Sequence, residues 1–347
     1  MGVRSSWTWI SMCGGVAALW LGLAATAHAQ SGTETENDGP DGVTVVGASA
    51  QVFWASGDFT ALDNYFEEMA RPAERFEDGG SHLMGLSHGL GLSIGASTTR
   101  KEWEHSLSQI REWRQKNPQS TAVDIVEAQI QRLWAWTARG RNSRAVTSEG
   151  RKLFEERLQR AEEVLFRSKE RSSSNPLWYL EYLNVARARG WNPEEFRALY
   201  AAAIDRFPDF DPFYYAMIRY LDPDWDGDIE QIDAYIAEAA KQTEARQGKI
   251  MYARLYWYLA DTRNQSFSLF EDSAANWADI KTGFEQLIAA TPKSLWNLNN
   301  FASLACRAGD ADTYRKLRKQ IGKRIYHASW PDNYTLEICD QRLIRTI

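Results

Sequence analysis

A run of aspartates gives this chain its clearest potential for chemistry. Residues 222–228 read DPDWDGD, so Asp222, Asp224, Asp226 and Asp228 alternate with other residues and a glycine follows Asp226. This spacing matches the start of an EF-hand loop, in which carboxylates at positions 1, 3 and 5 converge on one calcium ion around a tight turn. Position 12 is Asp233, whose side chain is shorter than the usual glutamate. Two interpretations stay open: a calcium site formed by these five aspartates, or an acidic turn that caps the next helix.

Two glycine–serine motifs raise the question of a hydrolase. Residues 85–89 read GLSHG and residues 91–95 read GLSIG, and both match the G-x-S-x-G pattern of a nucleophile elbow. An elbow needs a strand before the serine and a helix after it, and no strand-like segment precedes Ser87. We therefore expect residues 71–98 to form an irregular, Gly-rich connection, and a hydrolase that uses Ser87 is the third of three candidate functions.

A cysteine pair is the third candidate for chemistry. Of the three cysteines, only Cys306 and Cys339 lie beyond residue 29. An even pair in an oxidising compartment favours a disulfide, which closes a loop of roughly thirty residues and stabilises the fold by about 3–4 kcal/mol on the loop-entropy model. The alternative is a pair of free, buried thiols. No histidine lies at ligand spacing from them, so the sequence predicts no zinc site and indicates no cofactor other than calcium.

The first 29 residues indicate where the protein works. Arg4 gives a positive start, residues 7–23 an apolar core, and residues 27–29, AHA, a small-x-small cleavage site. This pattern predicts a secretory signal peptide over 1–29, cleaved after Ala29, and a periplasmic or secreted mature chain. The apolar run is near the lower limit for a membrane span, and we expect no span after cleavage. Residues 30–50 are rich in Gly, Thr, Asp, Glu and Ser, which predicts a disordered leader.

Composition narrows the range of partners. The chain is 44% hydrophobic and 25% charged, as in ordinary globular proteins, and its net charge is −6. A nucleic-acid-binding protein needs a basic face, so we expect no nucleic-acid partner. Twelve of the fifteen tryptophans lie beyond residue 29. Their rings serve either as large fillers between helices or as an aromatic cleft that stacks on sugar rings or other flat ligands.

Apolar residues recur with a helical period from residue 51 onward. Asp58 is suited to cap the first of these helices, and in the segment 192–207 Asn192 is a good N-cap, Pro193 suits the first turn, and Pro208 ends the helix. Residues 200–208, YAAAIDRFP, look like the second helix of a tetratricopeptide repeat. The pattern predicts an all-α fold over 51–347, a tetratricopeptide-like solenoid of antiparallel helix hairpins with a concave surface.

Several segments resemble an uncharacterised family of exported bacterial proteins, a domain of unknown function with helical repeats. The resembling segments are 134–140, 190–192, 220–227, 252–257 and 306–310. The resemblance implies an all-helical fold and no assigned reaction, so it supplies no catalytic residue.

These observations lead to three candidate functions. The favoured one is an exported protein-interaction scaffold that binds an unidentified protein partner through its concave face, with exposed Tyr and Trp side chains as anchors. The second is a glycan- or small-ligand-binding module with an aromatic groove. The third is the hydrolase, and we do not expect an enzyme.

Overall fold

The protein is all-helical in the part of the chain that the structure describes. The computed structural model describes residues 42–72, 74–140, 146–225, 227–263 and 266–344, in which fifteen α-helices and short 3-10 turns but no strand are found. An isolated β-bridge joins Arg75 and Ser81. The all-α prediction is therefore confirmed. Within these residues the chain forms two compact units, divided between Tyr220 and Leu221.

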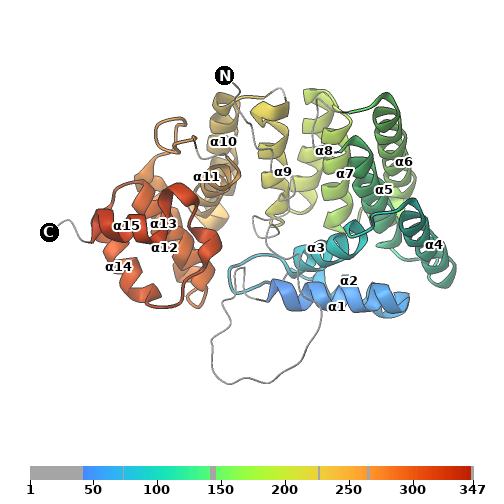
Figure 1. The fold of residues 1–347 in the computed structure, drawn as a ribbon, viewed down its shortest axis with the longest axis horizontal. Helices are drawn as coiled ribbons and strands as arrows, with labels where there is room; N and C mark the ends of the chain where they lie inside the picture. The colour runs from blue at the N-terminus through green and yellow to red at the C-terminus, as the bar shows by residue number, and fades with distance from the viewer. Residues whose placement is uncertain (1–41, 73, 141–145, 226, 264–265, 345–347) are drawn as a thin grey trace. The chain divides into compact units, whose positions relative to one another are not determined.

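The first unit contains nine of these helices (Figure 1). They are α1 (Val43–Ser56), α2 (Phe59–Met69), α3 (His82–Gly95), α4 (Arg100–Lys116), α5 (Val123–Arg139), α6 (Ser148–Ser172), α7 (Pro176–Ala188), α8 (Pro193–Arg206) and α9 (Pro212–Tyr220). Helix α5 packs on α6, and α7 packs on α8. Helix α7 also contacts both α5 and α9, so α5, α7 and α9 form a row of alternate helices.

The second unit contains the remaining six helices (Figure 1). They are α10 (Ile229–Gln247), α11 (Ile250–Thr262), α12 (Trp277–Ala290), α13 (Leu295–Arg307), α14 (Ala311–Ile321) and α15 (Leu336–Leu343). Each helix from α10 to α14 packs on the next one. The short helix α15 packs against both α13 and α14, so the end of the chain covers the last helix pair.

Side-chain caps explain where several helices begin. The Asp58 side chain accepts a hydrogen bond from the Ala61 N–H at the start of α2, as predicted. Asn192 likewise accepts from the Glu195 N–H, and Pro193 occupies the first turn of α8. These local signals lie in neighbouring residues, which is why the sequence identifies them.

Helices α1 and α3 correct two predictions. Residues 43–50 are helical, so a disordered leader over 30–50 is wrong for that part, and residues 30–41 lie outside the described residues. Helix α3 replaces half of the expected irregular connection over 71–98. The two helices cross at Gly47 and Gly89, where a Cβ on Gly89 would overlap the backbone of Gly47. Glycine weakens an isolated helix, but here it permits close packing that offsets this cost.

Candidate functional site

The aspartates of the predicted calcium loop have separate partners where their side chains are described. Asp222 is buried and forms an ion pair with Arg263 at the C-terminal end of α11. Asp228 caps α10 by accepting from the Gln231 N–H at 2.8 Å, and this bond lowers the pKa of Asp228. The acidic-cap interpretation is therefore correct for Asp228.

Asp233, the predicted last ligand, also has other partners. Its carboxylate accepts from the Tyr256 hydroxyl and from the Ala274 N–H, each at 2.8 Å. Asp226 and the side chain of Asp224 lie outside the described residues. Among the residues that the structure describes, no group of three or more His, Cys, Asp and Glu side chains is arranged to hold a metal ion. Calcium binding by these five aspartates therefore stays a prediction.

The glycine of this loop has a packing role. Residues Pro223–Trp225 form a 3-10 turn, and the chain then passes directly over Leu221. A Cβ on Gly227 would overlap the carbonyl group of Leu221. The turn therefore needs glycine for steric reasons, whether or not an ion binds.

An open, acidic hollow lies next to this loop. It has a volume of about 580 Å³ and is lined by Ile229, Glu230, Asp233, Ala234, Glu271, Asp272, Ser273 and Ala274. Glu230, Glu271 and Asp272 are exposed, and Asp233 is held by its two hydrogen bonds. The hollow is thus a solvated acidic surface. Among the described residues that line it, no buried polar group lacks a hydrogen-bond partner.

Ser87 does not lie in a nucleophile elbow. It is in the middle of α3, and its backbone carbonyl accepts from the Gln129 side chain at 3.3 Å. Its neighbour His88 is partly buried, and burial lowers the pKa of that imidazole. Because the motif is entirely helical, it lacks the strand-to-helix turn that exposes such a serine.

The tryptophans fill the spaces between helices. Trp103 and Trp113 are fully buried, Trp103 stacks on Trp134, and Trp113 stacks on Phe59. Each of the twelve tryptophans beyond residue 29 is buried or only partly exposed, as is each described tyrosine. The filler interpretation is supported, and none of these side chains is largely exposed, so their use as anchors stays a prediction.

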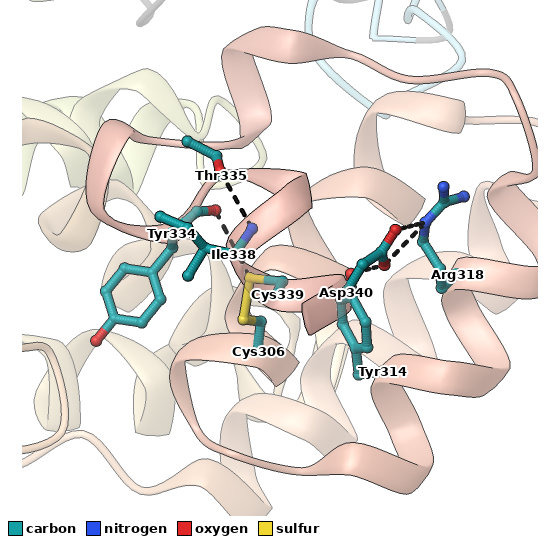
Figure 2. Close-up of a disulfide and its surroundings, with 8 residues drawn as sticks. All are labelled: Cys306, Tyr314, Arg318, Tyr334, Thr335, Ile338, Cys339 and Asp340. Atoms are coloured by element: carbon teal, nitrogen blue, oxygen red, sulfur yellow. Dashed lines mark hydrogen bonds and ion pairs between the residues drawn. A yellow bond between two sulfur atoms is a disulfide. The ribbon is translucent and has the colours of Figure 1, made fainter. Parts of the chain in front are cut away.

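The predicted cysteine pair joins α13 to α15 (Figure 2). The sulfur atoms of Cys306 and Cys339 lie at bonding distance as a disulfide, with their Cα atoms 5.8 Å apart. Next to Cys339, the Asp340 carboxylate accepts from the Tyr314 hydroxyl at 2.5 Å and from Arg318 Nε at 3.2 Å. Burial, together with this acceptor, raises the pKa of Tyr314. The disulfide and these bonds fix α15 to α13 and α14.

A ladder of polar side chains crosses the row α5, α7 and α9. Arg132 Nε and Nη2 donate to the two carboxylate oxygens of Glu181 at 2.5 and 3.0 Å. One turn further along α7, Asn184 accepts from Arg219 of α9 at 3.3 Å. Arg187 lies one turn beyond Asn184 and is partly exposed. The ladder therefore carries three arginines and one glutamate on adjacent helices.

A second polar face lies on α13, and the sequence analysis missed it. Asn300, Ser303 and Arg307 are three and four residues apart, so they share one side of the helix. The Ser303 hydroxyl and Arg307 Nε are buried and have no hydrogen-bond partner among the residues described. The spacing of three and four residues between Asn300, Ser303 and Arg307 is the signal that could have revealed this face.

No family model matches the chain, and no curated protein or solved structure matches it. Membership of the uncharacterised exported family therefore stays a prediction. None of the helices in the described part is long and apolar enough to cross a membrane.

Proposed function

We propose that this protein is an exported protein-interaction scaffold of the tetratricopeptide-like type. The observation that carries the proposal is the row α5, α7 and α9 with its polar ladder. In stacked helix pairs, each hairpin buries its apolar side against the next, and alternate helices line a concave binding surface. The contacts of α5 with α6, of α7 with α8, and of α7 with both α5 and α9 support this arrangement.

The charge of the ladder favours a partner that presents an acidic segment. Arg132, Arg187 and Arg219 lie on the three helices of the row, where Arg132 pairs with Glu181 and Arg219 donates to Asn184. Opposite charge on a partner fixes its register and speeds association. We propose an acidic, extended segment of a protein as the ligand of this row.

The place of action is part of the proposal. The signal-peptide pattern of residues 1–29 supports export to the periplasm or the medium. The first residue of the exported chain, read by N-terminal sequencing, should be Gln30. An exported chain that starts at Met1 would contradict cleavage after Ala29.

Glycan binding and hydrolysis have less support. Seven of the twelve tryptophans beyond residue 29 are buried, which weakens the support for the aromatic groove that glycan binding needs. The helical setting of Ser87 removes the reason for a hydrolase. Calcium at Asp222–Asp228 stays a separate proposal, as a structural clip that is compatible with the scaffold.

The test is capture of a partner in the native compartment, followed by a matched pair of variants. The chain is crosslinked where it is exported, purified and analysed by mass spectrometry for a stoichiometric protein. Arg187→Ala should reduce the captured amount by about tenfold, the effect of losing an interface residue worth about 1.4 kcal/mol. Lys152→Ala, on the exposed side of α6, removes the same charge and should leave capture unchanged.

Equal melting temperatures of the two variants establish that the fold is intact. A chain that captures no protein, or equal capture by Arg187→Ala and Lys152→Ala, would contradict the scaffold proposal.

A further inference from the structure

The polar face of α13 contains unused hydrogen-bonding groups. Asn300 and Ser303 are 3% and 2% exposed, and the Ser303 hydroxyl has no hydrogen-bond partner in the part of the chain described. A buried polar group without a partner costs about 1–3 kcal/mol. Native proteins rarely retain such groups unless water or a ligand satisfies them. The Ser303 hydroxyl and Arg307 Nε are two such groups about one turn apart on the same helix, and they indicate a place where something binds.

Arg307 adds a positive charge to the same face. Its guanidinium carbon lies 5.7 Å from the centre of the Tyr334 ring, and its Nε is buried without a hydrogen-bond partner in the residues described. The side chain as a whole stays partly exposed, and it forms no ion pair within those residues. An arginine held against an aromatic ring with a buried Nε–H that lacks a partner is pre-organised to receive an anion.

The nearest acidic group is Asp261, near the end of α11. It interacts electrostatically with Arg307, but the two groups form no ion pair in the described chain. Asp261 is solvent-accessible, yet protein atoms crowd around it. Their desolvating effect raises the pKa of its carboxyl to about 6, against the opposing effect of Arg307. Asp261 and Tyr334 are the titratable groups that interact with Arg307 here.

We propose that Arg307, Ser303 and Asn300 form a binding site for a carboxylate monoanion. The planar guanidinium matches the two oxygens of a carboxylate, while the serine hydroxyl and the asparagine amide supply neutral donors from the same helix face. The site has one cation, Arg307, and the acid Asp261 beside it. This balance favours a ligand with one negative charge over a ligand with two. The ligand is a small free acid or the C-terminal carboxylate of a peptide, which share this chemistry.

The inference is independent of the scaffold proposal, because it rests on contacts within the second unit alone. It can therefore fail while the row α5, α7 and α9 still binds a protein, and the reverse also holds.

The test is isothermal titration of the full exported chain with two probes. The first is sodium lactate, and the second is an N-acetylated tetra-alanine peptide with a free C-terminus, with its C-terminal amide as the control. Arg307→Gln should weaken binding of the carboxylate probe by at least about tenfold, the effect of losing a charge-assisted pair. Lys316→Gln, an exposed change of equal charge on α14, should leave binding unchanged.

Saturation by lactate alone assigns a small acid, and saturation by the free-acid peptide but not by its amide assigns a chain terminus. No saturable binding of either probe, or equal binding by Arg307→Gln and Lys316→Gln, overturns the proposal.

Discussion

Reduction of the Cys306–Cys339 disulfide should lower the stability of the second unit by about 4 kcal/mol. The bond joins residues 33 positions apart. On the loop-entropy model, a loop of that length removes about 13 cal/mol/K of entropy from the unfolded chain, which is about 4 kcal/mol at 25 °C. For a unit of this size, that corresponds to a fall in melting temperature of about 10–20 °C.

The assay is differential scanning calorimetry of the purified chain with and without a thiol reductant. Mass spectrometry should confirm that the reduced sample has gained two protons. The first unit contains no cysteine, so its transition should not move. The double variant Cys306→Ser/Cys339→Ser should melt at the temperature of the reduced protein and should not respond to reductant.

Two results would refute this reasoning. A reduced protein whose second transition shifts by less than about 2 °C would show that the loop contributes little, because the reduced unfolded state is already compact or the native contacts of α15 compensate. An equal shift of both transitions would show that the two units do not unfold separately.

Three further perturbations test the packing of the fold by thermal melting. Gly89→Ala should destabilise the first unit by about 1–3 kcal/mol, because the added Cβ meets the backbone of α1. Gly95→Ala, in open space at the end of the same helix, should be neutral or stabilising. Equal effects of the two substitutions would contradict the close approach of α1 and α3. Glu181→Ala should cost about 1.5–3 kcal/mol, since it removes two charge-assisted hydrogen bonds from the partly buried Arg132, and a loss below about 1 kcal/mol would contradict that. Burial raises the pKa of Asp310, but hydrogen bonds from α12 and α14 outweigh it and lower the pKa. Asp310 therefore contributes to the stability of the second unit above about pH 4, and this contribution is lost as the pH falls below that value. Asp310→Asn should therefore destabilise the second unit by about 1–3 kcal/mol at pH 7 and by less near pH 3, and a constant difference would argue against this linkage.

The candidate chemistry was only partly visible in the sequence. The cysteine pair could be predicted because an even number of cysteines in an exported chain has few ways to pair. The separate partners of Asp222 and Asp233 could not be predicted, because Arg263, Tyr256 and Ala274 are distant from them along the chain. The same holds for the α13 face, where burial and the lack of partners identify Ser303 and Arg307.

The sequence by itself determined the helical class and many helix starts. Period and caps act between residues three or four positions apart, so Asp58, Asn192 and Pro193 were sufficient to place their helices. Only the tertiary structure decided that residues 43–50 and 82–95 are helices. Their glycines and lack of amphipathic pattern argue against helix locally, and the close approach of Gly47 and Gly89 offsets that cost through packing between segments about forty residues apart.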